Sequence, residues 1–126
     1  MQVLFEAIYN RFVSEGKFGL TELYNTEAPA DAVFPYGVFS IPSNTPDWTF
    51  TENFENFLIQ FNLFSEKTLA TEACEAFEAL KTAFDFHDLV VVGYTPITME
   101  REVANVIRVE KVWQYNITYR LLIQKG

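Results

Sequence analysis

The chain has 126 residues, of which 49% are hydrophobic and 17% aromatic, and its formal net charge is −8. This length predicts a single domain, residues 1–126, with a sizeable core, and the hydrophobic content argues against intrinsic disorder. The negative charge, without any run of Lys or Arg, disfavours sequence-specific nucleic-acid binding and an anionic membrane surface.

The first predicted element is a helix over residues 2–15, which Gly16 is placed to end. Its apolar residues recur at helical spacing: Leu4, Ala7, Ile8 and Phe12. Because the N-terminus carries Glu6 and lacks a basic start and an apolar core, it does not predict a signal peptide. No apolar stretch reaches the length of a membrane span, so we expect a cytoplasm-like compartment.

Residues 17–32 are loop-like, and a first strand is predicted over residues 33–41, where Pro35 marks a strand start or an edge. The segment PSNTPDWTFTEN, residues 42–53, is predicted to be a turn-rich loop because it holds two prolines and several turn-forming residues. The aromatic residues of this segment could serve a contact surface or a core, and both interpretations remain open.

Residues 54–64, FENFLIQFNLF, predict a strand whose apolar residues alternate on one face. Ser65 or Thr68 can then cap a second helix that runs to about Asp85. Its predicted apolar stripe is Leu69, Ala73, Ala76, Phe77, Leu80 and Phe84. The only cysteine, Cys74, excludes an intrachain disulfide and is predicted to be a small buried hydrophobe.

A third strand is predicted over residues 89–101, beginning LVVVGY, and a fourth over about 107–124. Residues 100–108 are predicted to form the hairpin between them. The order is therefore helix, strand, strand, helix, strand, strand. We predict an α+β domain in which two helices pack on one face of an antiparallel four-stranded sheet.

Titratable groups give little sign of catalysis. His87 lies in the segment Asp85-Phe-His-Asp88, which could hold a metal or relay a proton, but a helix end is the simpler interpretation. Glu72, Glu75 and Glu78 share a helix face that we interpret as solvated. Neither a phosphate-binding glycine loop nor a nucleophile motif occurs. We therefore expect no enzymatic activity, no cofactor and no metal.

The residues that remain as candidates point to contacts between chains. On the loop and the next strand they are Trp48, Phe50 and Phe54, and on the hairpin they are Arg101, Val103, Val106, Ile107 and Arg108. Aromatic anchors carry much of the binding energy of many interfaces. Apolar residues at a predicted turn indicate either an interface or burial within the same subunit.

This layout resembles the tail-terminator, or tail-completion, proteins of long-tailed bacteriophages, which include tail-to-head joining proteins. The resemblance is carried by the N-terminal helix LFEAIYNRF, the strand that opens Pro35-Tyr36, the strand LIQFNLFS leading directly into the helix LATEACEAFEALKTAF, and the last strand WQYNITYRLLI. It covers nearly the whole chain. Gly37 departs from the bulky residue that usually follows Pro-Tyr.

The resemblance implies a homo-oligomeric ring, usually a hexamer, on the head-proximal end of the tail tube. Such a ring ends tube polymerisation and faces the head connector, so the implied partners are copies of the chain itself, the tail tube protein and a head–tail connector protein. Viral DNA passes through without specific binding. The implied location is the virion, with the host cytoplasm during assembly.

Two alternatives remain open from the sequence. One is a neck or head-completion protein on the connector side. The other is a small-ligand binding domain or enzyme with a pocket between the helices and the sheet, for which His87 and Asp88 are the polar candidates.

Overall fold

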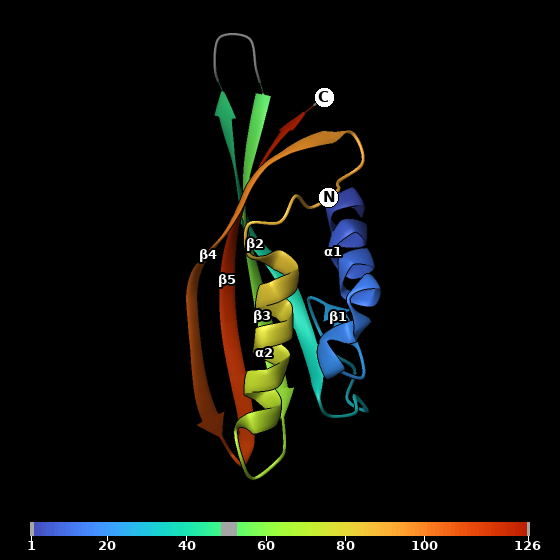
Figure 1. Ribbon diagram of the computed structural model, residues 1–126, viewed down its shortest axis with the longest axis vertical. Coiled ribbons are helices and arrows are strands. Elements are labelled where there is room, and N and C mark those ends of the chain that lie inside the picture. The colour runs from blue at the N-terminus through green and yellow to red at the C-terminus, as the bar shows by residue number, and fades with distance from the viewer. Residues whose placement is uncertain (1, 49–52, 126) are drawn as a thin grey trace.

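The computed structural model describes residues 2–48 and 53–125 of the chain, and places their five strands in one sheet (Figure 1). The elements in chain order are α1 (Gln2–Ser14), the short turn η1 (Gly16–Gly19), β1 (Leu23–Asn25), β2 (Tyr36–Trp48), β3 (Asn53–Ser65), α2 (Thr71–Phe84), β4 (Tyr94–Val109) and β5 (Val112–Lys125). The strand order across the sheet is β1-β2-β3-β5-β4. Both helices lie on the same side of the sheet in Figure 1.

The core lies between this helix-bearing face and the two helices. Alternate residues of β3 and β5 point into it and are essentially inaccessible to solvent: Phe57, Ile59, Phe61 and Leu63, with Ile117, Tyr119, Leu121 and Ile123. The predicted helical stripes face them through Leu4, Ile8 and Phe12 of α1 and Ala76, Leu80 and Phe84 of α2. The apolar residues that recur every second position in the strands therefore pack against those that recur every 3.6 positions in the helices.

The predicted antiparallel four-stranded sheet is wrong, because the sheet has five strands and is mixed. The additional strand β1 pairs in parallel with β2, with Leu23 opposite Gly37. The other pairs, β2 with β3, β3 with β5 and β5 with β4, are antiparallel. Gly19, Pro29 and scattered acidic residues make residues 17–32 loop-like in sequence, and a strand of three residues is too short to show an alternation.

The predicted loop over residues 42–53 is mostly strand. β2 continues to Trp48 and β3 begins at Asn53, so the two strands form a long hairpin that projects beyond the helices (Figure 1). The register shifts between Ser40 and Ser43, which places Pro42 at a bulge. β1 pairs only with residues 37–39, so the rest of β2 is an edge that tolerates proline.

The second predicted hairpin is displaced along the chain. Residues 100–108 lie within β4, and the turn is at Glu110 and Lys111, which both have positive φ as in a two-residue hairpin turn. Residues 89–92, predicted to start this strand, pair with no strand, and Val92 lies in a turn, so β4 begins only at Tyr94.

Gly37 allows the start of the sheet to close over the core. A Cβ atom there would lie 3.0 Å from Leu23 Cδ1, 3.1 Å from Leu63 Cδ2 and 3.2 Å from Leu20 Cδ1. The three leucines occupy the space that the bulky residue expected after Pro-Tyr would take. The missing side chain is therefore a packing requirement of β1 against β2.

We expect Gly37→Val to lower the free energy of unfolding by about 1–3 kcal/mol, because the added methyl groups overpack this contact. Denaturant unfolding followed by circular dichroism measures it. The control is Ser40→Val on the opposite face of the same strand, expected to change stability by less than about 0.5 kcal/mol. Equal stability of the two variants would contradict the packing argument.

Candidate functional site

Strand β4 is an outer strand of the sheet and pairs on one side only, with β5. Every β4 residue after Met99 is exposed. Four large apolar residues among them are between 39% and 54% exposed: Val103, Val106, Ile107 and Val109. The predicted interface residues Val103, Val106 and Ile107 therefore lie along this edge, and Val109 extends the apolar row. Val103, Ile107 and Val109 face one side of the sheet, and Val106 faces the other.

The distal half of this edge lacks the usual protection against pairing with another chain. Both register shifts of β4 lie before it, between Pro96 and Thr98 and between Arg101 and Val103. Residues 103–109 then pair regularly with β5, contain neither proline nor glycine, and include one charged residue, Arg108. Native proteins usually interrupt, shorten or charge an exposed edge strand. Residues 103–109 are thus a surface fit for contact with another chain.

Arg101, another predicted contact residue, is exposed but forms its contacts within the same chain. Its guanidinium Nη2 atom lies 3.5 Å from Asp85 Oδ2 and its Cζ atom 5.3 Å from the centroid of the Phe77 ring. Asp85 also accepts a hydrogen bond from the hydroxyl of the fully buried Tyr119. Arg101 therefore stabilises the junction of α2 with the sheet.

Burial and the contact with Asp85 raise the pKa of Tyr119 far above its ordinary value. Burial is the largest cause, followed by the hydrogen bond to Asp85 and by the negative charge of that carboxylate, while Arg101 acts in the opposite direction. The neutral phenol is therefore the form that the fold requires.

Arg108 lies near the far end of β4 and keeps its side chain at the surface. Its Cζ atom is 5.0 Å from the centroid of the Trp113 ring, and its Nη1 donates a hydrogen bond of 2.7 Å to the carbonyl of Thr68. It forms no ion pair with any residue of the described chain. Its charge is available to a partner.

The aromatic candidates lie at the other end of the sheet. Trp48 is opposite Asn53 at the described limit of the β2–β3 hairpin, and Phe50 lies outside the described residues. Phe54 is half-buried and pairs with Asp47 and Gln124. The structure thus separates the predicted set into two groups, one on the projecting hairpin and one on β4.

A third exposed apolar group was not among the sequence candidates. Phe86, Val90 and Val92 are between 75% and 82% exposed, in the segment that joins α2 to β4. The intervening Leu89 and Val91 are buried. The apolar run LVVV in the sequence could have indicated this group, but the sequence analysis assigns it to a paired strand.

The face of the sheet away from the helices is polar at its centre. No helix or strand of the described chain packs on it, and it carries a row of amide side chains across three strands. Hydrogen bonds join Gln60 to Asn62, Gln114 to Asn116, and Asn116 to Asn105. On the same face, Arg120 pairs with Glu102 at 2.7 Å. This face is therefore polar at its centre, unlike the apolar edge of β4.

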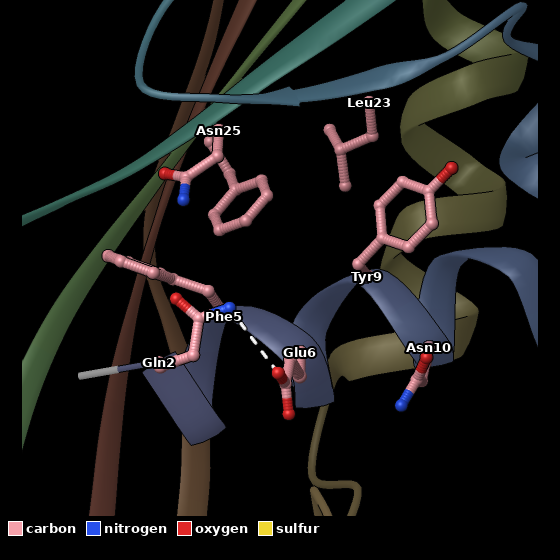
Figure 2. Close-up of a pocket in the computed structure, with 8 residues that line it drawn as sticks. Gln2, Phe5, Glu6, Tyr9, Asn10, Leu23 and Asn25 are labelled. Atoms are coloured by element: carbon pink, nitrogen blue, oxygen red, sulfur yellow. Dashed lines mark hydrogen bonds between the residues drawn. The ribbon is translucent and has the colours of Figure 1, made fainter.

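A shallow pocket of about 250 Å³ lies between α1 and the β1–β2 edge. Figure 2 shows Tyr9 rising from α1 toward Leu23, while Glu6 and Asn10 point away from this gap. The Tyr9 hydroxyl donates a 2.7 Å hydrogen bond to Glu22, which raises the pKa of Tyr9. Small-molecule sites usually have several converging polar groups. Because Glu6 and Asn10 point away from the gap, this pocket gives the small-ligand alternative little support.

The remaining sequence candidates do not converge on a site. His87 lies against Arg11, with 3.1 Å between Arg11 Nη2 and His87 Nδ1. Within residues 2–48 and 53–125, no three His, Cys, Asp or Glu side chains are grouped to hold a metal. Cys74 is exposed, so its predicted burial is wrong. None of the described helices is long and apolar enough to cross a membrane.

The sequence matches no protein-family model and no curated protein. The structure is similar to a solved chain described as "Virion of native gene transfer agent (GTA) particle". The TM-score is 0.77 at 16% sequence identity, and the match covers 94% of this chain and 92% of that chain. The two chains therefore share a fold over nearly their whole lengths.

The raised pKa of Tyr119 predicts a loss of stability in alkali. Because the unfolded phenol ionises near its ordinary pKa of about 10, the stabilisation is complete below that pH and is lost as pH rises above it. Tyr119→Phe should cost about 1–3 kcal/mol at neutral pH, since Asp85 loses a donor, and should flatten the alkaline decline. Denaturant unfolding at a series of pH values tests both effects, and an unchanged alkaline slope in the variant would contradict the argument.

Proposed function

We propose that this chain is a structural virion protein that caps the head-proximal end of a phage tail tube as a homo-oligomeric ring. In this role it ends tube polymerisation and joins the tail to the head, and it has no enzymatic activity. The observation that carries the proposal is the similarity of fold, over nearly the whole of both chains, to a chain from a gene transfer agent virion. The resemblance to tail-terminator proteins supplies the position within the particle.

The exposed edge of β4 supports assembly with other chains. A closed ring needs two different surfaces on each copy, because each lateral contact joins one surface to another. The apolar row on β4 is one such surface, and its burial would stabilise the ring by the hydrophobic effect. The projecting β2–β3 hairpin, in which β2 ends at Trp48, is proposed to contact the tail tube protein or a neighbouring copy. The candidate Phe50 lies outside the described residues.

The negative charge of the chain suits a conduit through which DNA passes without specific binding. Six copies in the proposed hexamer carry a formal charge of −48, which is six times −8. Like charges repel DNA and also one another, so the lateral contacts must outweigh this repulsion. The remaining partners in this proposal are the tail tube protein on one side and a head–tail connector protein on the other.

The mass of the purified protein in solution tests the ring. Size exclusion with light scattering should give a species of six times the chain mass of 14.6 kDa, and electron microscopy should show it as an annulus. Because salt screens repulsion between the acidic copies, the ring should become more stable as salt rises. Association that weakens with salt would contradict an apolar lateral contact.

We expect Val106→Lys to weaken ring formation by at least about tenfold, because an interface cannot bury an unpaired ammonium group without cost. The added positive charge lowers the overall repulsion, so a loss of assembly cannot come from net charge. The matched control is Val33→Lys, at a position that is 64% exposed and outside the sheet. Light scattering over a dilution series measures both variants, and equal association would exclude Val106 from the contact.

The position in the particle is tested by co-purification from cells that produce the virions. Association with tail tubes lacking heads supports the tail cap. Association with DNA-filled heads lacking tails would contradict it and favour the connector-side alternative.

A further inference from the structure

We propose that residues 88–92 of one copy add to the exposed β4 edge of the next copy as an antiparallel strand. This inference rests on the proposed function, because it requires that identical copies assemble. It names residues 88–92 as the second surface that each copy needs in a ring, beside the β4 edge. It identifies the ring interface as a heterologous one between two segments that are far apart in each subunit (Figure 1).

Residues 88–92 have the features of a strand that lacks a partner. They belong to no helix or strand, and Val92 lies in the turn that leads into β4. Leu89 and Val91 are buried, whereas Val90 and Val92 are exposed. Among their backbone groups, the described chain provides one hydrogen bond, from the Tyr94 N–H to the Val91 carbonyl. Alternating burial without a hydrogen-bonded neighbour leaves both apolar side chains and backbone groups for another chain to satisfy.

The β4 edge also has backbone groups without a strand to pair with. Residues 103–109 are paired on one side by β5 and present the other side, unprotected, along seven regularly paired positions. Five residues of added strand fit within this length. Addition of a strand to an open edge satisfies backbone donors and acceptors on both partners at once.

Charge and side-chain direction select one register. Asp88, Val90 and Val92 are exposed on one side of their segment, and Ala104, Val106 and Arg108 share one face of β4. Antiparallel pairing of Val90 with Val106 places Asp88 opposite Arg108. Neither charge has an ion-pair partner in the described chain, and opposite charges directly across two strands attract.

This heterologous contact covers residues 88–92 and the β4 edge, residues 103–109, in every copy. Pairing β4 with β4 across a two-fold axis would instead leave residues 88–92 uncovered, with Val90 and Val92 still in solvent. Repetition of the heterologous contact closes a ring when the rotation permits, as the proposed function requires.

Cysteine cross-linking tests the pairing in the full chain, in a Cys74→Ser background that removes the native exposed thiol. Differently tagged Val90→Cys and Val106→Cys chains are mixed at the highest attainable concentration and treated with a short thiol cross-linker. We expect a mixed Val90–Val106 product as the main species, and little product from either variant alone. Val33→Cys mixed with Val106→Cys is the matched control and should give none.

Three results would overturn the inference: a Val106–Val106 product in excess, an oligomer of ring mass without the mixed product, or a protein that stays monomeric. The second of these leaves the proposed ring intact, so failure of the interface and failure of the function are distinguishable.

Charge exchange gives an independent measurement. Asp88→Arg and Arg108→Asp should each reduce association by at least tenfold, and the double variant should recover most of that loss. Circular dichroism checks that each variant is folded, because Arg108 also bonds the Thr68 carbonyl. If the double variant associates no better than the weaker single variant, Asp88 and Arg108 do not lie opposite each other in the contact.

Discussion

Phe61 of β3 lies at the centre of the fold, with its ring centroid 5.1 Å from that of Phe84 in α2 and 5.9 Å from that of Tyr119 in β5. This contact joins the second helix to the two central strands, and Phe84 also meets Phe18, which packs on Phe12 of α1. Both helices are therefore fixed through one chain of aromatic contacts. Because a helix layer covers only one face of the sheet, the opposite face and the outer strand β4 remain open.

That one-sided arrangement explains why the chain carries apolar side chains that its own core does not use. The exposed rows on β4 and in residues 86–92 lie away from the central aromatic contact, on segments joined to the core by few buried residues. Asp85 connects these regions, since it receives the Tyr119 hydroxyl and pairs with Arg101 just before the exposed half of β4. The Asp85–Arg101 pair thus ties the start of the exposed half of β4 to the end of α2.

The sequence predicted part of the candidate site for a reason that proved incomplete. Apolar residues are unusual at a hairpin tip, and for that reason the sequence indicates Val103, Val106 and Ile107 as contact residues. In the structure they lie on a strand, and the turn comes later, at Glu110 and Lys111. Their exposure follows from the edge position of β4, which no local pattern reveals. Arg101 was predicted as a contact residue, but its charge is directed to Asp85, a partner distant in sequence.

The sequence by itself determined the elements that have strong periodicity: α1, α2, the core of β3 and the alternating β5, because side-chain direction in helices and strands follows from local geometry. Only the tertiary structure decided that Leu20 and Leu23 pack over Gly37 and so recruit the short parallel strand β1. It also decided that the proline-containing residues after Ile41 continue β2, and that residues 89–92 stay unpaired. Strand pairing depends on partners remote in sequence, so a local pattern can indicate an extended segment but cannot say what lies beside it.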